Sequence, residues 1–114
     1  AHSKRLGSPA GRTVREAMAY IHEHYAEPLT RTEIAAHVAI TERYLTHCFR
    51  QELGVTPVMY LNRYRVRRAR QMLEESRCTI TEVALAVGFS DASYFNRVFR
   101  QEVGVTPSEY RRKQ

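Results

Sequence analysis

The sequence of 114 residues is poor in the residues that interrupt or cross-link a chain. Two cysteines, Cys48 and Cys78, are too few for a disulfide framework, and we expect both to be buried and reduced. Five glycines and four prolines leave long stretches without a helix breaker. No apolar run approaches the length of a membrane span, and no secretory signal pattern is present. These absences favour a cytoplasmic protein without membrane contact.

Enzyme signatures are also missing. The sequence has no nucleotide-binding glycine loop, no nucleophile elbow and no metal-ligand spacing. His22 and His24 lie two residues apart and would point to different sides of a helix, which makes them a poor metal pair. We therefore expect a protein that is not an enzyme, with no catalytic residues, no metal and no cofactor.

Acidic residues are outnumbered by basic ones, 12 to 18, which gives a formal net charge of +6. Such a balance suits a polyanionic partner such as nucleic acid, although many basic proteins bind nothing in particular. The hydrophobic fraction of 43% is sufficient for a modest core. The length predicts one domain, or two small subdomains that share a helix.

Two stretches that lie fifty residues apart are nearly identical. Arg50–Pro57 reads RQELGVTP and Arg100–Pro107 reads RQEVGVTP, so seven of eight positions agree. In each stretch the glycine is expected to end a helix, and Thr-Pro is expected to begin the next one. Between the copies, Val58–Arg77 contains neither Gly nor Pro. We predict a rigid helix of about 20 residues, roughly 30 Å long, that joins two similar units.

One arc of this joining helix is apolar and includes Val58, Leu61, Val66, Ala69, Met72 and Leu73. The opposite arc carries Arg63, Arg67 and Arg70, which face either solvent or DNA. Arg65 falls inside the apolar arc. We expect its guanidinium to be partly buried and paired with a carboxylate, because an unpaired buried charge is costly.

Capping residues divide the rest of the chain into short helices. Residues 1–12 are predicted to be a flexible tail or linker, followed by a helix from Val14 to about Tyr25 that Thr13 and Glu16 begin. Expected subdomains cover residues 13–55 and 78–114, on either side of the joining helix at 56–77. Their further helices are expected to start at Thr30, with Glu33, and at Thr41, Thr81, Ser90 and Thr106, and to include Glu42–Leu53 and Asp91–Val103.

Each subdomain contains a short helix, a turn and a longer helix, which is the arrangement of a helix-turn-helix motif. The second helix of such a motif enters the major groove of DNA. The short helices align forty-nine residues apart and the longer ones fifty apart, so one extra residue near Ala92 lies in or just after the second turn. The apolar arcs of the longer helices are Tyr44, Leu45, Cys48 and Phe49, and Tyr94, Phe95, Val98 and Phe99.

The opposite arcs of these helices differ between the copies and carry hydrogen-bonding side chains. We predict base-reading roles for Arg43, Thr46 and His47 and for Ala92, Ser93, Asn96 and Arg97. Arginine can donate two hydrogen bonds to guanine, and asparagine can pair with adenine. Alone, each residue would more simply be a solvated surface side chain. The predicted phosphate contacts are Thr30, Arg31, Arg50, Ile80, Thr81 and Arg100, with a structural role left open for the two later arginines.

A more specific signature lies in the second copy and the joining helix. It comprises Ile80–Ala84, Val87–Asp91, Ser93–Phe95, Arg97, Phe99, Arg100, Gly104–Pro107, Tyr110 and Arg111, with Pro57, Tyr60, Leu61, Arg65, Ala69 and Leu73. In these residues the chain, from roughly Val14 to Arg112, resembles the DNA-binding domain of the AraC/XylS family of bacterial transcription regulators. The resemblance implies an all-α domain of about seven helices with two helix-turn-helix subdomains. It places base readers at the seven positions given above, where His47 stands at a position that the family often fills with Arg.

The resulting hypothesis is sequence-specific binding of double-stranded DNA in the major groove, which regulates transcription. One alternative is a protein-interaction module that docks to RNA polymerase. Another is the DNA-binding part of a DNA-repair protein, because some relatives of such domains are fused to alkylation-repair modules. If the chain is a piece of a longer protein, we expect an effector-binding or dimerisation domain before Ala1.

Overall fold

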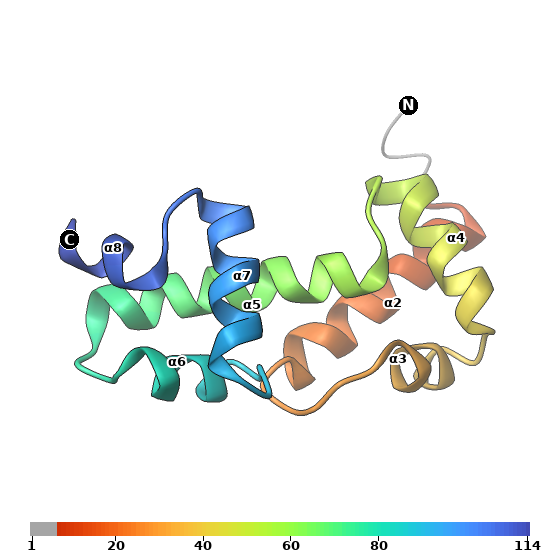
Figure 1. The fold of residues 1–114 in the computed structure, drawn as a ribbon. Coiled ribbons are helices and arrows are strands. Elements are labelled where there is room, and N and C mark those ends of the chain that lie inside the picture. The colour runs from red at the N-terminus through yellow and green to blue at the C-terminus, as the bar shows by residue number, and fades with distance from the viewer. Residues whose placement is uncertain (1–6) are drawn as a thin grey trace. The chain divides into compact units, whose positions relative to one another are not determined.

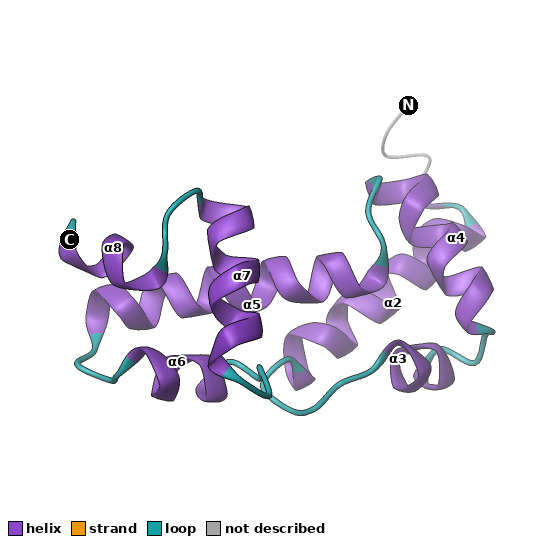
Figure 2. Cartoon of the chain, in the orientation of Figure 1, coloured by secondary structure: helices purple, strands orange, loops and turns teal. Residues whose placement is uncertain are grey.

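The computed structural model describes residues 7–114, and in that part of the chain it contains seven helices and no strand (Figures 1 and 2). The all-α fold expected from the sequence is confirmed. The helices are α2 (Pro9–His24), α3 (Arg31–His37), α4 (Glu42–Leu53), α5 (Pro57–Glu75), α6 (Ile80–Ala86), α7 (Ala92–Val103) and α8 (Pro107–Arg112).

The helices belong to two compact units. Unit 1 contains the chain up to His24 and Leu29–Leu61, and unit 2 contains Tyr25–Pro28 and Asn62–Gln114. The long helix α5 therefore contributes its first residues to unit 1 and the remainder to unit 2.

The core of unit 1 is formed where α2, α3 and α4 pack together. The Tyr60 ring of α5 meets Phe49 edge-on, with ring centroids 5.9 Å apart. The fully or almost fully buried side chains of this core are Val14, Ala17, Ile21, Ile34, Ala35, Leu45, Cys48, Phe49 and Leu61.

Helix α2 begins earlier than the sequence suggested. The Ser8 Oγ accepts a hydrogen bond from the Gly11 N–H at 3.0 Å, and Pro9 occupies the first helical position, where its missing N–H costs nothing. The prediction of a start at Thr13 was wrong, because Ser8 supplies an equally good cap five residues earlier. Residues 9–12 of the predicted tail are thus helical, and residues 1–6 lie outside the described residues.

The core of unit 2 is richer in aromatic rings. Phe95 and Phe99 are completely buried, and Phe89 and Tyr110 pack against them at centroid distances of 5.1 and 5.7 Å. The other buried members of the cluster are Val66, Ala69, Leu73, Val83, Ala84, Val87 and Val98.

The helix caps confirm the other predicted starts except two. Thr79, and not Thr81, caps α6, because its side chain accepts from the Glu82 N–H while Glu82 bonds back to the Thr79 N–H. Asp91, and not Ser90, caps α7 by accepting from the Tyr94 N–H at 2.7 Å. In both places two adjacent or nearby residues could cap, and the carboxylate or the capping box prevails.

These caps also locate the extra residue of the second copy. Ala39 and Gly88 both adopt positive φ, 59° and 101°, at the same point of the two turns. The next residues, Ile40 and Phe89, donate their N–H to the equivalent carbonyls of Ala35 and Ala84 at 3.1 and 3.0 Å. Because Thr41 and Asp91 are equivalent caps, Ser90 is the inserted residue. It lies just before α7 and leaves the buried registers of both helices unchanged.

Arg65 is buried as expected, with 6% of its surface exposed. Its hydrogen bonds, however, go to backbone carbonyls, where the sequence suggested a carboxylate. The Nε donates to Tyr25 O and the Nη2 to Glu27 O, both at 2.8 Å, while the guanidinium lies over the Phe89 ring at 5.6 Å. Burial lowers the pKa of Arg65 from its ordinary value. Arg65 therefore holds segment 25–28 within unit 2.

The basic arc of α5 is exposed and partly engaged within unit 2. Arg63 forms an ion pair with Glu102 at 3.1 Å, and Arg70 donates to the Tyr110 hydroxyl at 3.3 Å. Val58, expected on the apolar arc, is 42% exposed, because it lies in the first turn of α5. No helix in the described part of the chain is long and apolar enough to cross a membrane.

Candidate nucleic-acid interface

Helix α4 separates its side chains into a buried and an exposed side. Leu45, Cys48 and Phe49 are completely buried, which anchors the helix in unit 1. The predicted base readers Arg43 and His47 are exposed, and Thr46 is half-buried. The helix therefore presents the three predicted readers from one anchored element.

Tyr44 departs from the predicted inward position, since it is 41% exposed. Its ring lies alongside that of His47, with the centroids 6.1 Å apart. The Cys48 side chain beside its hydroxyl raises the pKa of Tyr44. Its counterpart Tyr94 is more enclosed, because the Asn62 Nδ2 donates to the Tyr94 hydroxyl at 2.9 Å.

Helix α7 repeats the division in unit 2. Phe95, Val98 and Phe99 are buried, at 6% exposure or less. The predicted readers Ser93, Asn96 and Arg97 are exposed, and Ala92 is half-buried at the start of the helix. The guanidinium of Arg97 lies over the Tyr94 ring at 5.3 Å, and this contact directs it along the outer surface of α7.

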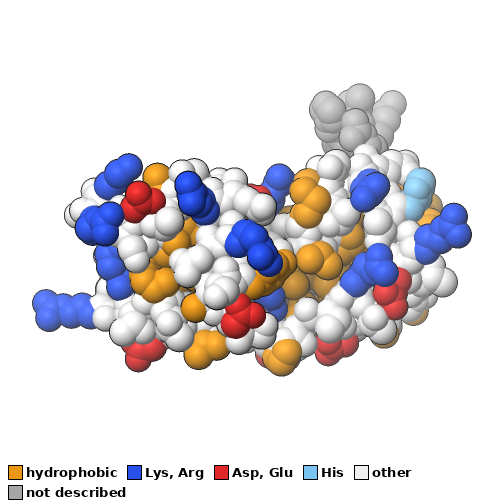
Figure 3. Space-filling view, in the orientation of Figure 1, with side chains coloured by type: hydrophobic (Ala, Val, Ile, Leu, Met, Phe, Trp, Pro, Cys, Tyr) orange, Lys and Arg blue, Asp and Glu red, His pale blue; other side chains and the backbone are white. Residues whose placement is uncertain are grey.

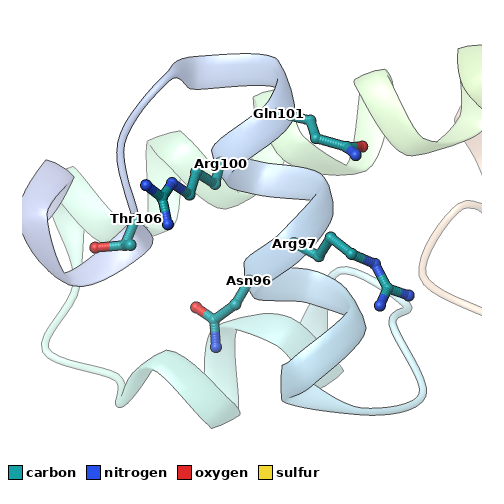
Figure 4. Close-up of a pocket in the computed structure, with 5 residues that line it drawn as sticks. All are labelled: Asn96, Arg97, Arg100, Gln101 and Thr106. Atoms are coloured by element: carbon teal, nitrogen blue, oxygen red, sulfur yellow. The ribbon is translucent and has the colours of Figure 1, made fainter.

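A hollow of about 490 Å³ lies beside α7 and is lined by Asn96, Arg97, Arg100, Gln101 and Thr106. Figure 4 shows Asn96 and Arg100 on the side of α7 that faces Thr106, whereas Arg97 extends from the other side of the helix. Sequence reasoning missed Gln101 and Thr106 as parts of this surface. Both belong to the repeated eight-residue stretch, which was interpreted only as a signal for helix ends.

The N-terminal corner of α4 contains an ionic network. Glu42 accepts from Arg31 at 3.0 Å and from the Thr32 hydroxyl at 2.8 Å. The hydrogen bond from Thr32, and then that from Arg31, lower the pKa of Glu42, which is therefore ionised at neutral pH. The predicted phosphate ligand Arg31 is thus already paired. Glu42 was missed, although it stands fifty residues before the predicted reader Ala92.

The starts of α3 and α6 use the same capping box. The Thr30 N–H donates to Glu33 Oε1 at 3.1 Å, so the N–H of this predicted phosphate contact is already engaged. Arg31, Ile80 and Thr81 occupy the first helical positions, where N–H groups have no partner within their own helix.

Arg50 and Arg100 are exposed near the ends of α4 and α7. Among residues 7–114, neither guanidinium has a hydrogen bond or ion pair with another side chain. The Thr106 hydrogen bonds lower the pKa of Glu109, and the charges of Arg112 and Arg100 lower it further. Arg100 therefore lies in the electrostatic field of a carboxylate, which is a difference from Arg50.

Charge is spread over the surface that these helices form. Figure 3 shows Lys and Arg side chains distributed over the face in view, with fewer acidic ones. Within the described residues, no group of three or more His, Cys, Asp or Glu side chains could hold a metal ion. The exposed chemistry of both units is hydrogen-bond donation on a basic background.

Comparison with known families finds a matching model described as a helix-turn-helix domain, which covers residues 34–113. Among curated proteins, the chain is 37% identical over 110 residues to the arabinose operon regulatory protein of Escherichia coli K12. The match covers 96% of this chain and 38% of that protein, so the chain spans well under half of this relative's length.

Solved structures agree with this match. The C-terminal domain of AraT, a response regulator from Geobacillus stearothermophilus, aligns with a TM-score of 0.87 at 31% identity, over 94% of this chain and 89% of that one. The DNA-binding domain of AdpA, a global transcriptional factor solved in complex with a target DNA, aligns with a TM-score of 0.82 at 30% identity. That alignment covers 87% of this chain and 89% of the AdpA domain.

Proposed function

The chain belongs to the AraC family of DNA-binding transcription regulators, and on this premise we propose that its two helix-turn-helix units read two major-groove sites on one DNA duplex. The observation that carries the proposal is the repeated division of α4 and α7. In each helix a fully buried apolar side fixes an exposed side of hydrogen-bonding residues. A bacterial cytoplasmic location follows as part of the same proposal.

The proposed base readers are those predicted from the sequence. Arg43 and Arg97 each carry a fork of N–H groups that fits the O6 and N7 atoms of guanine, and Asn96 fits the edge of adenine. Because the exposed residues of the two helices differ, the two half-sites are expected to differ in sequence. The full proposed set is Arg43, Thr46, His47, Ala92, Ser93, Asn96 and Arg97.

Contacts to phosphate would fix the register of the protein on DNA. Arg50 and Arg100 are exposed and free of side-chain hydrogen bonds among the described residues, which supports such a role. The N–H groups of Ile80 and Thr81, which have no partner within α6, support it as well. For Thr30 and Arg31 the support is weaker, since both already bond to carboxylates.

We also propose that both units bind on one side of the duplex, in successive major grooves. The 19 residues of α5 extend about 28 Å, compared with a groove repeat of about 34–36 Å. We propose that DNA bending makes up the shortfall, so that bend-prone steps between the half-sites favour binding.

Selection of bound duplexes from a random pool tests the proposal directly. Two conserved half-sites about one helical turn apart are expected, with binding that weakens steeply as salt rises. Arg43→Ala and Arg97→Ala should each lose about 1–3 kcal/mol of discrimination, at one base position in different half-sites. Selection that enriches no sequence, together with indifference of binding to salt, would refute DNA recognition by this chain.

A second function, docking of RNA polymerase or another protein, is supported by one apolar surface of unit 2. Leu85 is 54% exposed and borders a hollow of about 200 Å³ that Ala26, Pro28, Gly88, Phe89 and Ser90 complete. An exposed apolar side chain beside such a hollow offers a place for an apolar side chain of a partner to pack. Docking there would coexist with DNA binding, because Leu85 does not belong to the proposed reading surface.

A further inference from the structure

The two units differ in charge at equivalent corners. Glu42 begins α4 in unit 1, and the equivalent residue of unit 2, fifty positions later, is Ala92. Arg31, which is the ion-pair partner of Glu42, begins α3, and the residue at the equivalent position of α6 is Ile80. The corner between the short helix and the reading helix is therefore ionic in unit 1 and apolar in unit 2. This difference lies next to the proposed base readers and calls for a functional explanation.

The shortest hydrogen bonds of this corner are all accepted by the Glu42 carboxylate. Glu42 Oε1 accepts from Arg31 Nε and Nη2, both at 3.0 Å, and Oε2 accepts from Thr32 Oγ1 at 2.8 Å. The remaining terminal nitrogen of Arg31, Nη1, lies 3.4 Å from Thr46 Oγ1. That hydroxyl in turn donates to the Glu42 carbonyl at 3.1 Å. The proposed reader Thr46 is thus fixed from two directions.

Arg31 keeps some of its N–H groups for a contact with DNA. A guanidinium has five N–H groups, of which Glu42 receives two and Thr46 one. Among the described residues, these contacts leave one N–H on each terminal nitrogen of Arg31 without a partner. Because the hydroxyl of Thr46 is turned to the Glu42 carbonyl, its methyl group is the part left for a base.

The stability of such a pair is not its main consequence. The side chains of Arg31 and Glu42 are 47% and 39% exposed, and surface ion pairs contribute little to folding. Two other effects act on DNA binding. A side chain that is already fixed loses less entropy when it binds. An arginine whose charge is balanced by a carboxylate also releases fewer counterions when it binds DNA. Its contact therefore contributes more to the geometry of recognition than to salt-dependent affinity.

We propose that Glu42 is a positioning residue for DNA recognition by unit 1, which holds Arg31 against Thr46 and so determines the atoms that both present to a base pair. The proposal rests on the DNA binding proposed above. The expected target of the Arg31 fork is a base edge with two neighbouring acceptors, as on guanine. In unit 2, Ala92 and Ile80 leave the reading helix without such a support.

The test compares base preferences of the full chain and its variants, determined by selection from a random duplex pool and then by competition titration. Glu42→Ala should reduce discrimination about 5- to 100-fold at base positions of the unit 1 half-site. Preferences of the unit 2 half-site should stay unchanged and act as an internal control. The salt dependence should become steeper by about one unit of slope, because the released Arg31 can pair with a phosphate.

Matched variants separate positioning from simple charge. Glu42→Gln keeps an oxygen that accepts from Arg31 and should retain most of the discrimination. Arg31→Ala should lose the same base preferences as Glu42→Ala, but without the steeper salt slope. Glu16→Ala removes one exposed carboxylate from α2 and controls for net charge.

Two results would overturn the proposal. One is a Glu42→Ala protein that binds all sequences more tightly and keeps its base profile, because Glu42 would then act only by repelling phosphate. The other is an Arg31→Ala protein with an unchanged profile. Failure of the wild-type chain to enrich any sequence would instead refute the DNA binding itself, so the two failures can be told apart.

Discussion

Gly88 allows the sharpest prediction about stability, because two penalties meet there. Its φ of +101° is unfavourable for any residue with a side chain. A Cβ built on Gly88 would also lie 2.2 Å from the carbonyl oxygen of Tyr25 and 2.8 Å from Arg65 Nε. These two atoms form the 2.8 Å hydrogen bond that holds segment 25–28 in unit 2. A methyl group at this point must therefore separate them.

The expected loss can be worked out from these contacts. Forcing a non-glycine residue to positive φ costs about 1–2 kcal/mol. Breaking a buried hydrogen bond of a charged donor adds about 1.5–3 kcal/mol. Gly88→Ala should therefore lower the free energy of unfolding by about 2.5–5 kcal/mol. For a domain of this size, each kcal/mol corresponds to a fall in Tm of about 4–8 °C.

Gly104→Ala is the matched control in the same unit. Gly104 has a similar φ of +93°, but among residues 7–114 no heavy atom other than those of its chain neighbours lies within 4 Å of its Cβ position. This variant should lose only the backbone part, about 1–2 kcal/mol. Urea unfolding followed by circular dichroism measures both losses. Equal losses would refute the claim that the contact with Tyr25 and Arg65 restricts position 88. The loss at Gly88 should also shrink in an Arg65→Met background, since the two changes break one bond.

The remaining predictions concern single contacts. Arg65→Met leaves the carbonyls of Tyr25 and Glu27 without this donor and should lower stability by about 2–4 kcal/mol in urea unfolding; an unchanged midpoint would contradict the assigned role. The lowered pKa of Glu109 means that its contribution to stability is present at neutral pH and is lost as pH falls through its folded pKa. The melting temperatures of Glu109→Gln and wild type should therefore differ at pH 7 and converge at low pH, and a constant difference would exclude ionisation as the cause. Leu85→Asp should abolish binding to a partner protein while DNA affinity stays within twofold, in direct titrations of each; retained protein binding would place docking elsewhere.

Local signals in the sequence predicted most of the fold. The Thr30–Glu33 capping box, the helix ends at Gly54 and Gly104, and the Thr106–Pro107 helix start were all predicted from a few neighbouring residues and are confirmed. Caps depend on atoms only three residues apart, so the sequence contains the whole interaction. Where two capping residues stood close together, as at Ser90 and Asp91, the prediction named the wrong one.

Contacts between distant residues escaped prediction. The apolar arc of α5 indicated that Arg65 is buried, but its partners are backbone carbonyls about forty residues earlier, which no residue type reveals. Glu42 escaped for a similar reason, since its role depends on Arg31 and Thr32 being brought beside it by the turn between α3 and α4. The proposed readers were accessible to sequence reasoning because a helical repeat places them on one side. The bases that these residues contact stay predictions.

The membership of Tyr25–Pro28 in unit 2 affects any dissection of the protein. A fragment that begins at Asn62 would contain every helix of the second motif but would lack the two carbonyls that receive the Arg65 guanidinium. Such a fragment would leave a cation among aromatic side chains without its acceptors, and weak folding of it would say nothing about the motif itself. To test unit 2 by itself, the fragment should be supplied with a peptide that covers residues 25–28, or Arg65 should be replaced in the fragment.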